Sequence, residues 1–257
     1  MSAMINRYQP AVSIFPLGDS AITAELGGDA DEELNSKALA MQDWLIARRF
    51  PGILDIIVAY HSVSVFYDPV RVRQERPDCR QGAFACVRDC LEEAWREARP
   101  AFVPERGTIR VPVCYGGEFG PDLQAVAEDK GASAEDCVGW HVGRTYRVFM
   151  VGFLPGFPYL GVVDERLRVP RREKPSPVKA GSVGLAGKQT GIYPVDSPGG
   201  WRIIGRTPWK LFDRDADMPI RLKTGDRVEF FPISPEEFAA EVARLAGLPR
   251  VAGQSPP

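Results

Sequence analysis

The sequence predicts a small α+β two-layer domain followed by a mostly-β barrel. In the first hundred residues, two amphipathic helical segments occur among β-branched and aromatic segments. That combination favours helices packed on one antiparallel sheet. Short strand-like segments separated by Gly/Pro turns fill the second half, a pattern typical of a closed barrel. The linker-like stretch 100–107 separates the two regions, so we expect domains over residues 1–105 and 106–257.

The first domain is expected to hold four strands and two helices. β-Branched and aromatic residues favour strands over 11–16, 21–26, 53–60 and 62–67. Apolar residues recur at helical spacing over 31–49 and 82–99. Gly18-Asp19-Ser20 marks the first turn. Acidic residues from Asp31 onward and basic Arg48 and Arg49 suit the two ends of the first helix dipole.

The second domain is expected to hold short strands, two short helices and a terminal helix. The strands are predicted over 108–115, 146–151, 183–186, 192–195, 202–205 and 227–231. The helices are predicted over 121–130, 133–142 and 235–245. Ser133 with Asp136 resembles a capping box. Pro112 lacks a donor, so its strand is expected at a sheet edge or with a bulge.

Composition indicates an ordinary globular chain. The 257 residues carry a net charge of −2, which points to no nucleic-acid surface. No apolar run approaches the ~20 residues that cross a bilayer, and no signal peptide is expected over residues 1–10. Five cysteines, an odd number, favour a reducing compartment, so we expect a cytoplasmic protein. Cys86 and Cys90 are interpreted as packed thiols on a helix face.

Residues 152–161 form the most unusual stretch, reading GFLPGFPYLG. Proline fixes φ and lacks an N–H donor, and glycine permits conformations closed to other residues. Together they exclude a helix and disfavour a regular strand. We therefore expect a constrained loop that holds Phe153, Phe157 and Tyr159 as one wall of a cleft. Phe149 and Phe230, inside strands, are expected in the core.

A second glycine-rich block, 181–208, supplies polar candidates. Its Gly187-Lys188 pair lacks the spacing of a phosphate-binding loop, because Ser182 stands where the first glycine is needed. Lys188 is still a candidate point charge for a phosphate or carboxylate. Arg202 and Arg206, four apart on a strand, are expected on one face about 13 Å apart. They either clamp an anion or form surface ion pairs.

Histidine is scarce in this chain. His61 and His141 are the only two, and they fall in different predicted domains, so we expect no metal site. His141 lies near the end of a predicted helix, just before the strand that leads into 152–161. It is either a cationic helix C-cap or a general acid/base, since histidine titrates near neutral pH.

Three motifs together resemble a known family. They are residues 152–161, 180–194 (AGSVGLAGKQTGIYP) and 197–208 (SPGGWRIIGRTP). They resemble the signatures of the 5-oxoprolinase B-subunit family, also called allophanate hydrolase subunit 1 or KipI-like. Residues 113–123 (VCYGGEFGPDL) and Gly18-Asp19-Ser20 are similar to further family segments. The resemblance covers roughly residues 10–245.

The resemblance implies a cyclophilin-like barrel and an ATP-dependent hydrolase complex. Together with its C (KipA-like) and A partner proteins, the family opens 5-oxo-L-proline to L-glutamate using ATP and water. A lactam needs carbonyl activation by phosphoryl transfer, hence cations for phosphate and donors for an oxyanion. The backbone amides of 187–191 are candidate donors. Mg²⁺ and ATP are expected on a partner protein or at the interface.

The resemblance and this chemistry together select nine side chains. The candidate catalytic residues are His141, Gln189, Arg202 and Arg206, and the candidate substrate-binding residues are Phe157, Tyr159, Lys188, Thr190 and Tyr193. Two alternative functions stay open at this point. One is a regulatory protein that inhibits a sensor histidine kinase, and the other is a component of an allophanate- or urea-type amidohydrolase.

Overall fold

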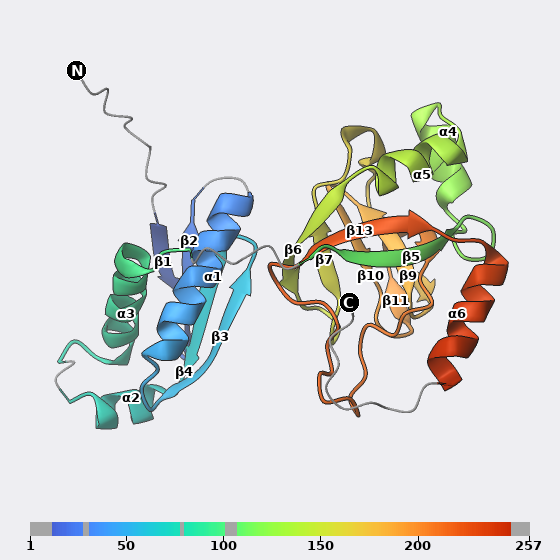
Figure 1. The fold of residues 1–257 in the computed structure, drawn as a ribbon. Coiled ribbons are helices and arrows are strands. Elements are labelled where there is room, and N and C mark those ends of the chain that lie inside the picture. Colours follow the sequence, from blue (N-terminus) through green and yellow to red (C-terminus); the bar gives the residue numbers. More distant parts are fainter. Residues whose placement is uncertain (1–11, 28–30, 78–79, 101–106, 248–257) are drawn as a thin grey trace, which may run out of the picture. The chain divides into compact units, whose positions relative to one another are not determined.

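The computed structural model describes residues 12–27, 31–77, 80–100 and 107–247 (Figure 1). The chain divides into two compact units, Met1–Val103 and Pro104–Pro257. Each unit has a hydrophobic cluster of its own. The predicted fold class, an α+β layer followed by a barrel, is confirmed. Within the described residues, no helix combines the length and apolarity needed to span a bilayer.

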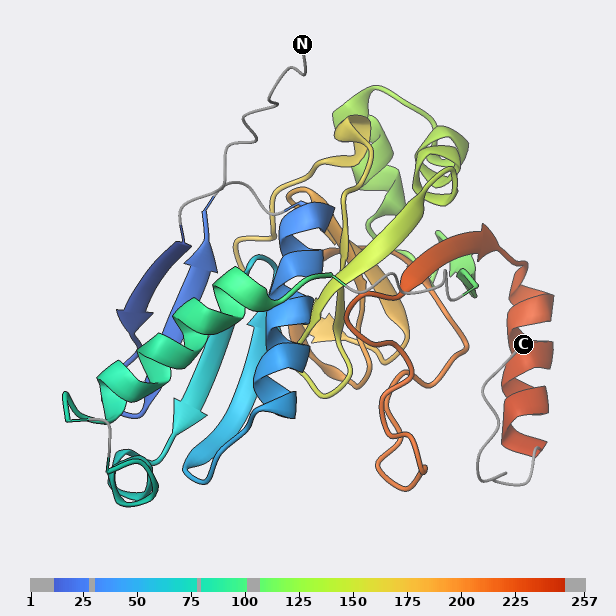
Figure 2. The same cartoon turned by 60° about the vertical axis from the view of Figure 1, so that its left-hand side comes forward.

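The first unit is a four-stranded antiparallel sheet with helices on one face (Figure 2). Its strands run in the order β1-β2-β4-β3, with bounds β1 Val12–Pro16, β2 Ala21–Leu26, β3 Ile53–Ala59 and β4 Ser62–Tyr67. Its helices are α1 Glu32–Ala47, α2 Pro69–Glu75 and α3 Ala83–Glu97. Ile22, Val63 and Leu91 are fully buried between these layers. The predicted strands, hairpin and two main helices are confirmed.

Two local predictions about this unit are wrong, and one helix was missed. α1 ends at Ala47, and Arg48 caps it instead of lying in its last turn. The short helix α2 was not predicted, although Asp68 accepts hydrogen bonds at its N-cap and Pro69 follows at its first position, a recognised start signal. Cys86 is disulfide-bonded instead of a free thiol, whereas Cys90 is free.

The second unit is a closed seven-stranded barrel in the order β10-β7-β6-β13-β5-β12-β9. The barrel strands are β5 Ile109–Tyr115, β6 Thr145–Val151, β7 Pro158–Gly161, β9 Ser182–Ala186, β10 Gln189–Ile192, β12 Arg202–Arg206 and β13 Arg227–Pro232. β8 (Ser176–Val178) and β11 (Ser197–Gly199) form a separate ribbon. The helices are α4 Leu123–Lys130, α5 Ala134–Val142 and α6 Pro235–Gly247, with a 3₁₀ turn at Glu165–Leu167. Phe149 and Phe230 are both 3% exposed, as expected.

Two barrel strands differ from prediction. β10 begins at Gln189 instead of Ile192, because Ala186 pairs with Gln189 across a two-residue turn that contains Gly187 at φ 58°. β5 is an interior strand between β13 and β12, so the expected edge is absent. Its Pro112 is accommodated because β12 pairs only with Cys114 and Tyr115.

Candidate functional site

The outer face of β7, β9, β10 and β12 carries an aromatic cluster, defined here as Phe157, Tyr159, Tyr193 and Trp201. Phe157 is its centre, with ring centroids 4.8 Å from Tyr159, 5.1 Å from Tyr193 and 5.3 Å from Trp201. Glycine lets the ring approach the barrel, since a Cβ on Gly191 would lie 2.9 Å from Phe157 Cζ. Tyr159 remains half-exposed, so the cluster reaches the surface there.

The 152–161 loop contributes to this cluster unevenly. Phe157 is 1% exposed, whereas Phe153 is 68% exposed and has φ 70°. The three rings do lie in one row, since the Phe153 and Phe157 centroids are 5.9 Å apart and those of Phe157 and Tyr159 are 4.8 Å apart. They differ in exposure: Phe157 is core, Tyr159 is half-exposed and Phe153 lies at the surface. Hydrogen bonds between backbone groups within the loop fix its shape. Gly152 N donates to Phe157 O at 3.1 Å, and Phe157 N donates to Leu154 O at 3.0 Å.

Polar groups border the aromatic cluster. Gln189 pairs with Gly161 and Ala186, and it lies on the outer side of β10 as Gly191 does. The Arg171 guanidinium lies 5.9 Å from the Trp201 ring. Burial raises the pKa of Tyr159, and the charge of Arg171 partly offsets that rise. Lys188 is exposed in the adjoining β9–β10 turn. This surface offers aromatic faces, an amide and cations. A flat ring that bears a carboxylate fits it, because the ring can pack on an aromatic face and the carboxylate can pair with a cation.

His141 lies inside the barrel, away from this surface. It is fully buried, with Nδ1 2.8 Å from Tyr115 Oη and Nε2 3.0 Å from Thr190 Oγ1. Thr190 donates to Gly184 O at 3.0 Å, so its hydroxyl accepts from Nε2–H and Tyr115 donates to Nδ1. Burial lowers the pKa of His141 to about 3. The cationic C-cap is therefore wrong, and the neutral ring ties α5 to β5 and β10.

The two arginines of β12 do not share a face. The β12–β9 register shifts between Ile203 and Gly205, which places Arg202 opposite Leu185 but Arg206 opposite Ser182. Leu185 and Ser182 are three apart on β9, so their side chains point to opposite sides. Arg206 donates from Nε to Ala180 O at 2.8 Å. The prediction of a shared anion clamp is wrong, because a β-bulge breaks the alternation.

Most backbone amides of 187–191 already have hydrogen-bond partners. Gly187 N donates to Val169 O at 2.7 Å. β10 has a strand on each side, β7 and β9, so its amides are used in the barrel ladders. Lys188 is the one predicted anion-binding group of this turn whose side chain is exposed. Among the described residues, no group of three or more His, Cys, Asp or Glu side chains is placed to hold a metal ion.

An ion pair between buried Asp122 and half-buried Arg172, which the sequence did not reveal, supports the cluster. Asp122 Oδ2 accepts from Ile203 N at 2.6 Å and from Arg172, which also bonds Ser176. Asp122 N donates to Ile203 O at 2.9 Å. This contact holds the β12 bulge and the loop that carries Arg171. The only signal was Asp122 at a helix start, where a capping role is the usual expectation.

Comparisons with known proteins agree with this architecture. Residues 12–222 match the family model described as carboxyltransferase domain, subdomain C and D. The chain is 40% identical over 238 residues to the 5-oxoprolinase B subunit of Bacillus subtilis (strain 168), covering 92% of this chain and 98% of that protein. The chain belongs to the 5-oxoprolinase B-subunit family. A second member, from Escherichia coli O157:H7, is 38% identical over 84% of this chain and 94% of its own.

Solved structures share the fold of this family member. The protein named TTHA0988 superposes with a TM-score of 0.70 at 34% identity, over 83% of this chain and 40% of that one. PH0987 from Pyrococcus horikoshii gives 0.51 at 39% identity, over 88% and 100%. The Kluyveromyces lactis urea amidolyase, at 20% identity and TM-score 0.69, shares the fold alone over 16% of its length.

Proposed function

We propose that this chain works as the B component of an ATP-dependent 5-oxoprolinase, together with its C (KipA-like) and A partner proteins. The complex opens 5-oxo-L-proline to L-glutamate at the expense of ATP, in the cytoplasm. The observation that carries the proposal is the similarity to proteins named as the B subunit of 5-oxoprolinase over nearly their whole length, 98% and 94% for two of them.

We place the lactam at the outer aromatic cluster. Its flat ring packs on Tyr159, the half-exposed member, and its amide bonds Gln189. Its carboxylate pairs with Arg171 or Lys188, both exposed. His141 and Thr190 act from inside the barrel as positioning residues, since their hydrogen bond holds β10 under Gln189. Neither needs to meet the substrate in this arrangement.

ATP enters the proposal as co-substrate of the whole complex. Gly187 N and the amides of β10 are already used in hydrogen bonds of the barrel unit, so 187–191 does not offer several donors to its phosphates. We therefore assign Mg²⁺–ATP to a partner protein or to a surface completed by one. ATP supplies the phosphoryl group that activates the lactam oxygen, and this chain binds and orients the ring.

Reconstitution tests the proposal. The purified chain mixed with its C and A partners should release glutamate and ADP from 5-oxoproline plus ATP, and omitting this chain should abolish that release. A complex that is inert with 5-oxoproline but consumes ATP with urea or allophanate would instead support the urea-type alternative. If the complex is fully inert and the chain by itself inhibits a histidine kinase, the proposal that the chain belongs to an enzyme is overturned.

A variant locates the site. Gln189→Ala should lower kcat/KM by about tenfold, the value of a hydrogen bond made to substrate, and the Tm is measured alongside. Gln124→Ala is the matched control, because Gln124 is an exposed glutamine on α4 bonded to Glu128. Equal activity in the two variants would show that the outer aromatic cluster is not the lactam site.

A further inference from the structure

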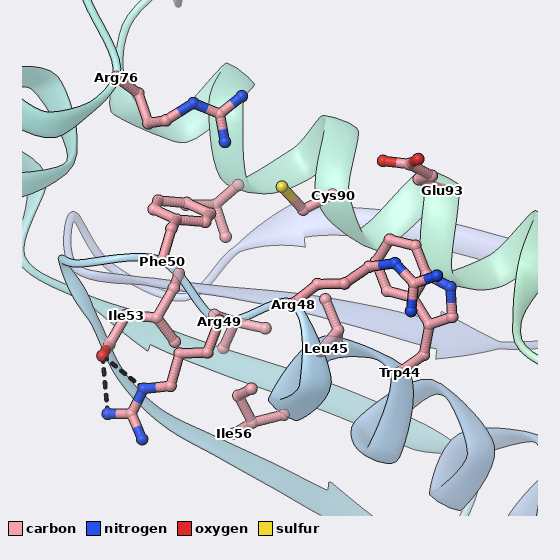
Figure 3. A pocket seen from close by; sticks show the side chains of 12 residues that line it. Trp44, Leu45, Arg48, Arg49, Phe50, Ile53, Ile56, Arg76, Cys90 and Glu93 are labelled. Carbon is pink, nitrogen blue, oxygen red and sulfur yellow. Dashed lines mark hydrogen bonds between the residues drawn. The ribbon is translucent and has the colours of Figure 1, made fainter.

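The first unit contains a pocket that the proposed function does not use. It lies between the C-terminal end of α1, the α1–β3 loop and α3 (Figure 3). The pocket has a volume of about 150 Å³. A cavity of roughly that size lined by aliphatic side chains accommodates benzene, so one aromatic ring fills it.

The floor of this pocket is apolar. It is made by Leu45, Ile53, Ile56, Val65 and Val87, all at most 8% exposed. These side chains belong to the core of the first unit, so the pocket opens into the core and not merely onto the surface. A ligand seated there is stabilised by the removal of its apolar surface from water.

The rim is cationic and rests on aromatic walls. Figure 3 shows Phe50 and Trp44 at two sides of the pocket. The Arg48 guanidinium lies 4.1 Å from the Trp44 ring, and that of Arg76 lies 5.1 Å from the Phe50 ring. Both guanidinium groups are thus held over flat rings, which limits their motion. The N–H groups at the edge of Arg48 can meet a carboxylate.

The charge balance favours an anion. Three arginines and one carboxylate, Glu93, line the pocket. Arg49 is already used, since it donates to Ile53 O at 2.8 Å and to Leu54 O at 2.6 Å. In the described part of the chain, the Arg48 side chain makes no hydrogen bond or ion pair with another residue, so its donors are available.

We propose that this pocket binds a small arylcarboxylate, such as a phenylacetate-type acid, with the ring on the apolar floor and the carboxylate on Arg48. The ring explains the size and the aliphatic floor. The carboxylate explains the guanidinium held at the rim. The proposal concerns the first unit alone, so its success or failure is independent of lactam opening at the barrel.

Titration of the full chain with phenylacetate tests the site. NMR should show saturable shifts for floor residues such as Val65 and Val87, with a Kd between about 10 µM and 1 mM for a ligand of this size. Phenylacetamide, a neutral isostere, should bind at least about tenfold more weakly. Equal binding of the two, or shifts confined to other residues, would overturn the proposal.

Two variants test the role of charge in binding, and they should change the affinity for phenylacetate in opposite directions. Arg48→Gln should weaken phenylacetate binding about tenfold, and Glu93→Gln should tighten it, because one removes a cation and the other a competing anion. Both side chains are exposed, so neither change should lower the Tm, which is measured alongside. Unchanged affinity in Arg48→Gln would contradict the assignment even if the ring binds.

Discussion

At the residue scale, Asp122 is the buried carboxylate that joins three segments of the barrel unit. It is 8% exposed and accepts from Ile203 N and Arg172. A buried carboxylate is tolerated only when its lone pairs are satisfied, and here a main-chain amide and a guanidinium satisfy them. The contact also explains why the bulge of β12 lies where it does.

Replacing Asp122 should destabilise the barrel unit. We expect Asp122→Ala to lower the free energy of unfolding by about 2–3 kcal/mol, because Arg172 and Ile203 N lose their partner in a largely buried place. Urea denaturation measures it. Asp215→Ala, at an exposed aspartate beside Arg214, is the control and should change stability by less than about 0.5 kcal/mol. Equal effects would show that the pair of Asp122 and Arg172 does not contribute to the stability of the barrel unit.

His141 makes stability depend on pH. Its pKa is lowered to about 3 by burial, against about 6.5 in an unfolded chain. Between these values the unfolded state binds a proton that the folded state refuses, so acid favours unfolding. This stabilisation is complete above pH 6.5 and falls by about 1.4 kcal/mol for each pH unit between pH 6.5 and about pH 3, where the folded state also begins to bind the proton.

Urea unfolding of the wild type and of two variants between pH 7 and pH 4 isolates that contribution. His141→Asn should lose this part of the slope, whatever its absolute stability. His61→Asn, which changes the other histidine, should keep it. If the wild type and His141→Asn show parallel pH profiles, the ring is not held neutral in the folded chain.

At the element scale, close packing of strands depends on glycine at particular positions. A Cβ on Gly205 of β12 would lie 2.6 Å from Val113 Cγ1 and 2.9 Å from Cys114 O on β5. Such an overlap involves the backbone, so a rotamer change cannot relieve it. The pairing of β12 with β5 closes the barrel, and Gly205 is therefore required for closure.

Two glycine substitutions should have opposite effects on stability. Gly205→Ala should cost about 2–3 kcal/mol through overpacking. Gly139→Ala in α5 meets nothing within 4 Å and should stabilise by about 0.5–1 kcal/mol, because alanine loses less entropy in a helix. Thermal unfolding of both variants checks the pair. A harmless Gly205→Ala would mean that the strands separate easily at this seam.

Signals in the local sequence predicted most helices and strands correctly. The errors arose where the pairing between strands determines the bounds or the position of a strand. The capping box of Ser133 and Asp136 and the buried stripe of α3 depend on neighbours a few residues apart. The start of β10 and the interior position of β5 depend on which strands pair. Alternation along one strand carries no information about such partners.

At the scale of the whole molecule, the two units have separate cores. Ile22 and Val63 belong to one cluster, and Leu160 and Val228 to the other. A unit with its own core is expected to fold alone. Residues 12–100 and 107–257, expressed separately, should each give dispersed amide NMR spectra and cooperative urea unfolding. A fragment that stays unfolded while the full chain folds would show that its core is insufficient.

Local periodicity and motifs in a recognisable order were enough to predict the fold class, most helices and strands, and the family. They also placed Phe157, Tyr159, Tyr193 and Gln189 in one neighbourhood. Three features became visible only in the folded chain: His141 is neutral and enclosed, Arg202 and Arg206 face apart, and Asp122 binds β12. Burial, a register shift and long-range ion pairing arise from contacts between distant segments, which no spacing along the chain encodes.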